Sequence, residues 1–503
     1  MDANLNKSLI QKTRETFRLL GVVEDALQRV RECPTREEVK EVLAGLSEFI
    51  ELQERVTRLE EQMRVYHELH PKLRAGLREI GYNEREVEEC MEDVPDLTLA
   101  DIEYAKSILE SYDTERTDLT EAFFGDTRLV VMPKIDTSKV ERIYQTWGKC
   151  RNLKYVPLLD FSSVKFAKYI FSYSEIDSLN GKDSVKLKRI QPFDFSAIEG
   201  NGLRFAFYCN QEVTKLGRIR IGAKCTDIGG IFGRLIKLKS FDGIEFEDFG
   251  NIRAARHSFE FWYNYPKLPV VDLGNIVDAD GMFRMREVCD LSEETIRSGC
   301  ASEVNLSSMF SWSWDASTNL GMTGAPKLEI KNPGSMSYMY VGCGGLRVIP
   351  DYCHLAPTSL ERFYAAQYGE GTRKYSEKLE RIEGLNFERV TSTEGIFSYF
   401  GKSRSTYSPY PILNPDLRYI RIVNLGKSAC AVYDLVGASS WGDGSEENLQ
   451  SLVDSLLTNS YDRQAAGMEP ATIRLDSTTA NRLTDVQKAA ITSKGYSITT
   501  IDV

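Results

Sequence analysis

The sequence predicts an α+β protein in three parts: an N-terminal α-helical coiled-coil or bundle module, a degenerate α/β solenoid and a C-terminal cap. Three observations predict this class. Apolar residues recur at helical spacing near the N-terminus, one motif occurs three times in the middle, and a helix–strand–helix–strand pattern closes the chain. The expected parts are residues 1–125, 126–444 and 445–503.

The composition is typical of a soluble globular protein with more than one domain. The chain has 503 residues, of which 42% are hydrophobic and 27% are charged. Its 63 basic and 74 acidic residues give a net charge of −11, which argues against nucleic acid or an anionic membrane as a partner. The first residues lack the apolar stretch of a secretory signal, and no apolar run reaches the roughly 18 residues of a membrane span. We therefore expect neither a signal peptide nor membrane insertion.

Residues 1–125 are expected to be helical. Six apolar residues follow one another at spacings of three and four, with charged residues between them: Phe49, Leu52, Val56, Leu59, Met63 and Tyr66. This seam ends before Pro71, after fewer than three heptads. It therefore fits an oligomerisation interface and an internal antiparallel hairpin equally well. Further helices are expected at 83–90 and from Thr98, whose capping partner is Asp101.

A motif of four residues at three-residue spacing is repeated in the middle of the chain. Its copies are Trp147-Cys150-Leu153-Val156, Trp262-Tyr265-Leu268-Val271 and Tyr340-Cys343-Leu346-Ile349. The copies start 115 residues apart (147 to 262) and 78 apart (262 to 340), or about five units of 23 and three units of 26. Both lengths fall within the leucine-rich-repeat range of about 20–29 residues. We therefore predict a leucine-rich-repeat-like solenoid in which Leu153, Leu268 and Leu346 are buried equivalents.

Short strands alternate with turns through this middle part. The expected strands lie at 203–208, 217–223, 327–332, 385–390 and 417–425. Several strands end in a residue whose side chain can bond the backbone where the chain turns: Asp136, Asp160, Asp272, Asn305, Asn332 and Asn424. The last 60 residues predict a cap with helices at 448–460 and 484–494, strands at 471–476 and 496–503, and Gly495 ending the second helix.

The ten cysteines predict reduced thiols rather than disulfides. No CxxC motif occurs and the spacing is irregular. Cys150 and Cys343 occupy the same place in the repeated motif, and Tyr265 replaces them in the second copy. A disulfide does not tolerate such a replacement, so both cysteines are expected to be buried core residues.

Motifs for chemistry are scarce, so we predict no catalytic residue, no cofactor and no metal site. There are only four histidines, and no phosphate-binding loop or nucleophile elbow is present. Glu245, Glu247 and Asp248 could supply the two carboxylates of a glycosidase, but alternating charges are ordinary on an exposed strand face. The protein is therefore expected not to be an enzyme.

Four aromatic residues outside the repeated positions are candidates for ligand binding. Trp312, Trp314, Tyr364 and Tyr368 could be exposed platforms that stack on a sugar or a protein. The alternative is that they fill an irregular core.

The segments W-G-K-C-R-N-L-K-Y-V-P (147–157) and Y-V-G-C-G-G-L-R-V-I-P (340–350) resemble the BspA-like (Treponema-type) leucine-rich repeat. Residues 379–390 look like the strand half of the same unit, and MPKIDTSKV (132–140) is similar to repeats of Bacteroides proteins and their phages. The final segment, 451–499, resembles the closing part of tail-fibre-like proteins of phages that infect gut Bacteroidetes.

This resemblance implies a structural virion protein, tail- or fibre-associated, that binds a protein or glycan at the host cell. Its implied partners are other virion proteins and further copies of itself, with a trimer as one arrangement, and its location is the virion, assembled in the host cytoplasm. The missing signal peptide favours this interpretation over a secreted or surface BspA-like adhesin. A polysaccharide-degrading tail enzyme is a second alternative.

Overall fold

The computed structural model describes residues 51, 54–55, 57–58, 68–172, 184–260, 268, 270–284, 289–311, 322–364, 378–397, 416–438 and 445–501. The chain divides into two compact units, 1–78 and 79–503. The described residues of the first unit are helical. All six residues of the expected seam lie outside the described residues: Phe49, Leu52, Val56, Leu59, Met63 and Tyr66. Their role in oligomerisation stays a prediction, as does the three-part division at 125 and 444.

Two capped helices stand near the start of the second unit. α3 (Glu84–Asp93) begins at Asn83 with a capping box, and α4 (Leu99–Ser111) begins at Thr98, whose side chain accepts a hydrogen bond from the backbone of Asp101. Both helices confirm the sequence prediction.

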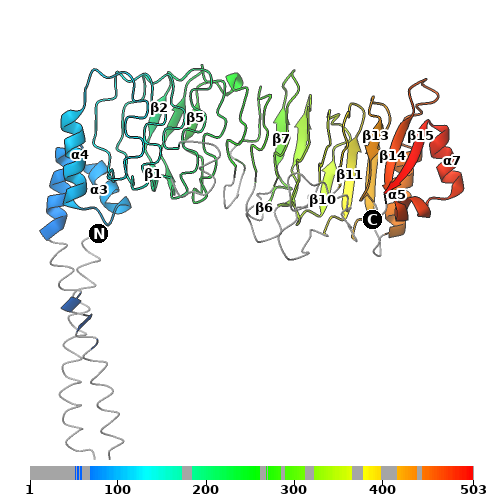
Figure 1. The fold of residues 1–503 in the computed structure, drawn as a ribbon, viewed down its shortest axis with the longest axis horizontal. Coiled ribbons are helices and arrows are strands. Elements are labelled where there is room, and N and C mark those ends of the chain that lie inside the picture. The colour runs from blue at the N-terminus through cyan, green and yellow to red at the C-terminus, as the bar shows by residue number, and fades with distance from the viewer. Residues whose placement is uncertain are drawn as a thin grey trace, which may run out of the picture. The chain divides into compact units, whose positions relative to one another are not determined.

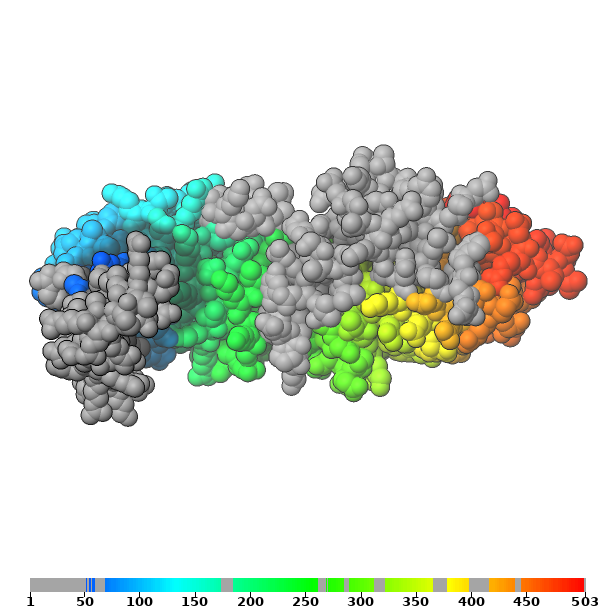
Figure 2. All heavy atoms as spheres, turned by 90° about the horizontal axis from the view of Figure 1, so that it is seen from below, coloured from blue at the N-terminus to red at the C-terminus, as the bar shows by residue number. Residues whose placement is uncertain are grey.

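After α4 the chain forms a series of successive segments that lie side by side, and we call each of these segments a pass (Figure 1). The strands that pair between passes are parallel in every pair. The strands are β1 (Arg189–Ile190), β2 (Phe193–Phe195), β3 (Lys215–Leu216), β4 (Ile219–Ile221), β5 (Ile244–Phe246), β6 (Cys289–Asp290), β7 (Thr295–Ser298), β8 (Met322–Gly324), β9 (Lys327–Ile330), β10 (Val348–Asp351), β11 (Arg381–Asn386), β12 (Tyr419–Val423), β13 (Val432–Asp434), β14 (Ala471–Asp476) and β15 (Tyr496–Ile501). They form small sheets in the orders β1-β3, β2-β4-β5, β6-β8, β7-β9, β10-β11-β12 and β13-β14-β15. Figure 2 shows that the second unit proceeds along its length in chain order.

Proline and glycine explain why the sheets are small. Pro192 separates β1 from β2, Gly217 separates β3 from β4, and Pro326 lies between β8 and β9. Proline has no N–H to donate to a neighbouring strand. At Gly217 a Cβ atom would lie 2.4 Å from the backbone nitrogen of Pro192, so only glycine lets these two passes meet. Each pass is therefore broken into short strands.

Besides the paired strands, a line of backbone hydrogen bonds connects the turns of neighbouring passes. We call this line the turn ladder. Each pass places a residue with positive φ at the same point of its turn, and the backbone N–H of this residue donates to the carbonyl just before the corresponding residue of the next pass. Tyr169, for example, donates to Arg204 at 3.2 Å. The ladder residues are Glu121, Gln145, Tyr169, Phe205, Gly230, His257, Gly281, Ser308, Tyr338, Arg362 and Gly395. The last N–H, of Gly395, donates to the buried carboxylate of Asp434 at 3.0 Å, which ends the ladder.

A column of stacked aromatic rings runs through the main core beside the turn ladder. Its members lie two residues after successive ladder residues: Phe123, Trp147, Phe171, Phe207, Phe232, Phe259, Phe283, Phe310 and Tyr340. Neighbouring ring centroids are 5.3 to 6.2 Å apart, the range that aromatic pairs prefer. Backbone hydrogen bonds and ring stacking therefore hold the passes in the same register.

The C-terminal residues form a distinct α/β layer. β13, β14 and β15 are joined by α5 (Ser445–Leu457), α6 (Ser477–Arg482) and α7 (Asp485–Ser493). The strands expected at 471–476 and 496–503 and the helix at 484–494 are confirmed, and Gly495 follows α7 with φ of +88°.

The predicted fold class is wrong. A leucine-rich-repeat-like solenoid needs a continuous sheet with a helix or 3₁₀ turn in each unit, but here the strands form small separate sheets. Among the described residues between Ser111 and Ser445, the helical element is the short 3₁₀ helix η2 (Phe249–Asn251). The physical reason is the left-handed residue in each turn, because a right-handed helix cannot contain one. The part of the chain that the structure describes also contains no N-terminal coiled-coil bundle, and the fold is mixed α/β.

Most of the individual strand predictions are confirmed, although the fold class is not. β4, β9 and β12 confirm the strands at 217–223, 327–332 and 417–425, and β11 overlaps the start of the one at 385–390. The strand expected at 203–208 is wrong, because Phe205 has φ of 55° and belongs to the turn ladder.

The predicted turn-forming side chains are mostly confirmed. Four accept a hydrogen bond from the backbone two residues on: Asp136, Asp160, Asp272 and Asn305. Asn332 donates to the backbone carbonyl of Cys300, whereas the side chain of Asn424 donates to that of Asn386.

Leu153, Leu268 and Leu346 are all buried, as predicted. Leu153 and Leu346 each lie six residues after a ring of the aromatic column. Trp262 lies outside the described residues, and Phe259 supplies the ring in that pass. Leu268 is therefore buried but does not share the offset of the other two leucines.

Replacing Phe232 by Ala should lower the free energy of unfolding by about 3–5 kcal/mol, the usual cost of removing a buried ring. The Phe232 ring is buried and lies 5.6 Å from that of Phe207 and 6.2 Å from that of Phe259. Urea unfolding of the full chain measures the loss. The exposed Val486→Ala is the control and should change stability by less than about 0.5 kcal/mol. Equal effects of the two substitutions would show that the column does not carry the stability.

Cys150 and Cys343 should react with a thiol reagent only after denaturation. Both are free and buried, and their Sγ atoms lie 2.9 Å and 3.1 Å from the carbonyls of Phe123 and Phe310. Burial raises the pKa of each thiol to about 12, so little reactive thiolate forms at neutral pH. Mass spectrometry of labelled peptides checks this. Rapid labelling of the native protein, or a bridge at either residue, would contradict it.

Candidate functional site

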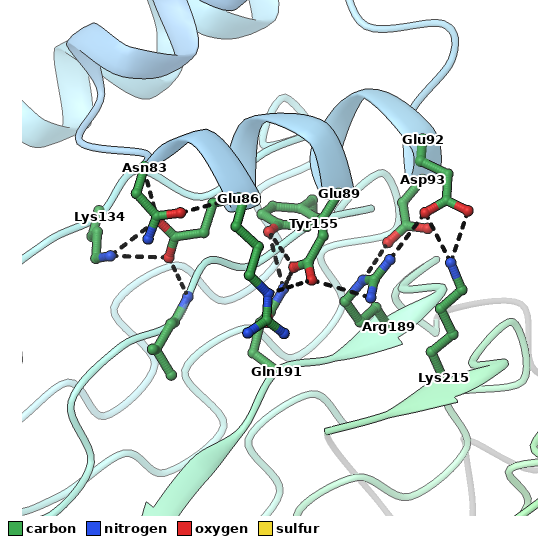
Figure 3. A network of polar contacts seen from close by, with 12 residues as sticks. Asn83, Glu86, Glu89, Glu92, Asp93, Lys134, Tyr155, Arg189, Gln191 and Lys215 are labelled. Atoms are coloured by element: carbon green, nitrogen blue, oxygen red, sulfur yellow. Dashed lines mark hydrogen bonds and ion pairs between the residues drawn. The ribbon is translucent and has the colours of Figure 1, made fainter. Parts of the chain in front are cut away.

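One polar network fastens α3 to the passes beside it (Figure 3). Its glutamates accept hydrogen bonds from three successive passes: Glu86 from the backbone of Leu158 (3.0 Å), Glu89 from Gln191 (2.9 Å) and Glu92 from Lys215 (2.8 Å). Glu86 also pairs with Lys134 at 3.0 Å. Residues three apart on a helix rise about 4.5 Å, close to the 4.7–4.9 Å between neighbouring strands. The spacing of acidic residues on α3 therefore matches the spacing of the passes.

The middle of this network is charged and largely withdrawn from water. Arg189 lies 3.0 Å from Asp93, 3.3 Å from Glu89 and 3.2 Å from Glu92. Burial alone would raise the pKa of Glu89, but hydrogen bonds from Gln191 and Arg85 lower it. Charges removed from water need such partners. The network therefore acts as an attachment for α3 rather than as a ligand site.

A second apolar cluster lies at the turn ladder, separate from the main core. It contains Tyr169, Phe205, Tyr208 and Cys209, with the half-buried Tyr144 against it. The rings of Tyr169 and Phe205 stack at 5.1 Å, and Tyr208 meets Phe205 edge-on at 5.2 Å. The side chains of these ladder residues thus point away from the core and build a face of their own, which we call the turn-ladder face.

Six successive passes each contribute one cationic residue to the turn-ladder face. These residues are Arg142, Lys168, Arg204, Arg234, Arg256 and Arg284. Several lie against the aromatic cluster. The Arg142 guanidinium is 4.2 Å from the ring centre of Phe166, and that of Arg204 is 5.3 Å from Phe205. Such contacts between a cation and a ring face are favourable and orient the charge.

Three carboxylates hold some of these cations in place. They form the pairs Asp227–Arg204 (3.5 Å), Glu260–Arg234 (3.3 Å) and Asp280–Arg256 (3.0 Å). Each carboxylate is less exposed than its partner: 20% against 27%, 3% against 11%, and 17% against 53%. The negative charges therefore lie deeper than the positive ones.

Glu260 is the centre of this arrangement. Its Oε1 accepts a hydrogen bond from Tyr208 at 2.6 Å, and its Oε2 lies 3.0 Å from His257 Nδ1 and 3.9 Å from Arg284. Burial alone would raise the pKa of Glu260, but the hydrogen bond from His257 and the charges of Arg234 and Arg284 lower it to about 2. The carboxylate is therefore ionised at neutral pH and binds side chains from four passes.

His257 links Glu260 to the group of cations. Its Nε2 accepts a hydrogen bond from Arg256 Nε at 3.1 Å, so Nδ1 is the nitrogen that carries the proton toward Glu260. The ring lies over Gly281, where a Cβ atom would come within 2.4 Å of it. Neighbouring passes thus constrain both the position and the tautomer of His257.

Two surface grooves lie elsewhere on the second unit. One, of about 530 Å³, has the half-exposed Leu158 beside Asp160 and Asp194, whose carboxylates each accept a backbone N–H two residues on. The other, of about 440 Å³, lies at the end of the turn ladder, where Asp434 is 3.6 Å from Arg474. The polar groups in both grooves are largely engaged in local turns and ion pairs.

Of the four predicted aromatic platforms, one lies within the described residues. Trp312, Trp314 and Tyr368 lie outside the described residues. Tyr364 is described, and its side chain is 2% exposed. The prediction of an exposed platform is wrong for Tyr364, because it lies two residues after the ladder residue Arg362, in the register of the buried rings.

The carboxylates considered for glycosidase chemistry form structural contacts. Glu245 pairs with Arg218 and Glu247 with Arg220 across neighbouring strands, and Asp248 caps η2 through the backbone of Gly250. Within the described ranges no group of three or more His, Cys, Asp and Glu could hold a metal ion. No helix in the same ranges has the length and apolar character to span a membrane.

Sequence analysis missed the turn-ladder face entirely. His257 and Glu260 are three residues apart, but Arg234 and Arg284 come from other passes. The available signal was a polar or small residue two positions before several core aromatics, as in His257 before Phe259 and Ser308 before Phe310, although Tyr169 and Phe205 break the pattern. Without the register of the passes this pattern has no meaning.

Comparison of the chain with known protein families, curated proteins and solved structures gave no match. The resemblance to BspA-like repeats and phage tail-fibre proteins therefore stays a prediction.

Replacing Glu260 by Gln should lower the stability at pH 7 by about 3–5 kcal/mol, because Arg234 and Arg284 lose a buried partner. The folded pKa near 2 lies below the ordinary value of 4.5, so the stabilisation by Glu260 is present above about pH 4.5. It is lost as the pH falls toward 2. The stability of the variant should therefore decline less than that of the wild type between pH 5 and pH 2.

Thermal unfolding across this pH range makes the comparison. The matched control is Glu212→Gln, which removes an exposed carboxylate paired with Lys237. It should follow the wild-type profile. A Glu260→Gln profile parallel to the wild type would show that the buried carboxylate does not titrate as described.

Proposed function

We propose that this chain is a structural protein of a phage virion, tail- or fibre-associated, that presents its turn-ladder face to a protein or glycan of the host cell. The observation that carries the proposal is a group of six cationic residues from successive passes, set among aromatic rings, three of which pair with carboxylates that are less exposed than they are. Polar and aromatic side chains held in register form a surface suited to recognition.

The restricted motion of the arginine side chains on this face supports a role in ligand binding. The side chain of Arg234 is 11% exposed, and Arg204 and Arg284 are about one quarter exposed, so much of their motion is already restricted. A ligand that meets side chains already in place loses less entropy on binding. The carboxylate of Glu260 accepts a hydrogen bond from Tyr208 and lies 3.0 Å from His257 Nδ1, which keeps this part of the face in one arrangement.

The virion part of the proposal rests on the resemblance of the motifs at 147–157, 340–350 and 451–499 to phage tail-fibre-like and BspA-like sequences. Other virion proteins and further copies of the chain are the proposed assembly partners. The apolar residues between 49 and 66 are the proposed contact, because six of them recur at helical spacing.

Mass spectrometry of purified phage particles tests the assignment. The chain should be present at a constant ratio to the major structural proteins, and the purified full-length protein should bind host cells and reduce phage adsorption. Arg234→Gln should weaken cell binding severalfold because it removes a cation of the face. The control Arg218→Gln removes a cation from the strand face and should leave binding unchanged.

Three outcomes would overturn this function. The chain could be absent from particles. It could appear in the envelope of uninfected cells, which would favour the adhesin. It could release new reducing ends from host polysaccharide, which would favour the tail enzyme.

A further inference from the structure

We propose that two copies of this chain associate through β15, with the two β15 strands pairing antiparallel, edge to edge, about a twofold axis at Thr499. This contact is separate from the helical residues between 49 and 66, and it does not depend on the proposed virion role. It follows from the unpaired edge of β15, from the residues that the strand contains and from its place in the second unit.

β15 is the edge strand of the last sheet, because the strand order is β13-β14-β15 and no described strand lies beyond it. The backbone N–H of Ala471 donates to the carbonyl of Gly495, which fixes the direction of the backbone groups along β15. In a parallel pair, alternate residues of a strand bond to the same neighbour. The odd-numbered residues of β15 therefore bond to β14, whereas the N–H and C=O groups of Ile498 and Thr500 point away from it.

β15 has none of the features that usually protect an edge strand. Natural edge strands carry charged residues or proline, or are interrupted by a bulge. The six residues Y-S-I-T-T-I contain no charge and no proline, and their register with β14 is unbroken over all six pairs. In contrast, the register shifts between β11 and β12 and between β6 and β8. An uncharged, regular edge of this kind is a template for another strand.

The apolar core is also partly open at β15. Ile498 and Thr500 lie on the same face of the sheet as their register partners Ile473 and Leu475, which are fully buried. Ile498 packs against the core but is only half-buried, and Thr500 is exposed. A strand added beyond β15 removes more of Ile498 from water, which is favourable.

The opposite end of the second unit indicates that the added strand is β15 of a second copy. α3 and α4 lie at that end (Figure 1), and Tyr104 of α4 donates a hydrogen bond to Asp126 beside the first pass. The first pass is therefore covered and does not offer its edge to β15 of another copy. A contact between two like ends needs a twofold axis, and two copies of one edge strand related by that axis are antiparallel.

Thr499 is the residue that fits on this axis. In a continuous sheet, opposite residues lie on the same face, so Thr499 meets its own copy and Ile498 meets Thr500. Ile498 and Thr500 carry the outward N–H and C=O groups, so they exchange hydrogen bonds in both halves of the contact. Two threonines directly opposite each other are a favourable cross-strand pair, and no like charges meet.

Charges placed at the axis test this pairing in the full chain. Thr499→Lys and Thr499→Glu each set like charges opposite each other in a pair of identical copies, whereas a mixture of the two variants sets opposite charges together. Thr499 is exposed, and the backbone bonds of β15 to β14 stay unchanged. The matched controls are Val486→Lys and Val486→Glu on α7, where the side chain is 79% exposed. Hydrogen exchange of the backbone amides of Ile498 and Thr500 is measured over a range of protein concentrations.

In the wild type, exchange at Ile498 and Thr500 should slow as the protein concentration rises. Each Thr499 variant alone should need at least about tenfold more protein for the same protection, and their equimolar mixture should recover the protection of the wild type. The Val486 controls should match the wild type, alone and mixed. Circular dichroism should show that all four variants are folded.

Several results would overturn the proposal. These are exchange at Ile498 and Thr500 that does not depend on the concentration of the wild type, full protection in the Thr499 variants, or a mixture that does not recover protection. Protection that appears only when another protein is added would assign the edge to that protein instead of a second copy. Association through residues 49–66 does not cover these amides, so their exchange reports on β15 alone.

Discussion

The turn ladder is the constraint on which the rest of the second unit depends. A left-handed residue with a side chain costs on the order of 1–3 kcal/mol, and eight such residues besides three glycines occupy this position in the described passes. The cost is tolerated because each of these residues donates its N–H to the next pass, in bonds such as that from His257 to Asp280 at 3.0 Å. The residue two positions on then always faces the core, so the rings from Phe123 to Tyr340 stack as one column. Register, core and turn are therefore consequences of a single backbone arrangement.

The same arrangement decides what the surface can display. Residues at the same place in neighbouring passes lie side by side even when they are far apart in the sequence. Lys168 and Arg204, 36 positions apart, are neighbours for this reason. A chain with a net charge of −11 can in this way carry a local group of cations. The acidic residues are gathered elsewhere, for instance on α3, where Glu86, Glu89 and Glu92 accept hydrogen bonds from Leu158, Gln191 and Lys215 of successive passes. The net charge of the whole chain therefore does not describe the charge of this face.

Local chemistry could be predicted from the sequence, and the arrangement in space could not. The capping box of Thr98 and Asp101, the strands of the C-terminal layer and the burial of Leu153 and Leu346 depend on neighbours within a few residues or on apolar character alone. The fold class failed because a left-handed turn at Phe205 or His257 has no local signal when the residue is not glycine. Uneven passes added to the difficulty. Ring positions 24 residues apart in one step (Trp147 to Phe171) become 36 apart in the next (Phe171 to Phe207). From Trp147 to Phe259 the column makes four steps that average 28 residues (112/4), so the expected five units of 23 were wrong.

The two ends of the turn ladder differ from its middle in a way that bears on function. At one end α4 lies beside the first pass, where Tyr104 donates a hydrogen bond to Asp126, and α3 crosses several passes and is fastened by an ion-pair network. At the other, the carboxylate of Asp434 replaces the carbonyl that a further pass would supply to Gly395. Both ends thus use buried charge to satisfy backbone and side-chain partners of the fold. In the middle, Glu260 satisfies Tyr208, His257 and Arg234 and still leaves arginine side chains partly exposed to solvent. A buried carboxylate that supports exposed cations is more than the fold requires, and it marks the middle of the ladder as the place where recognition is most readily built.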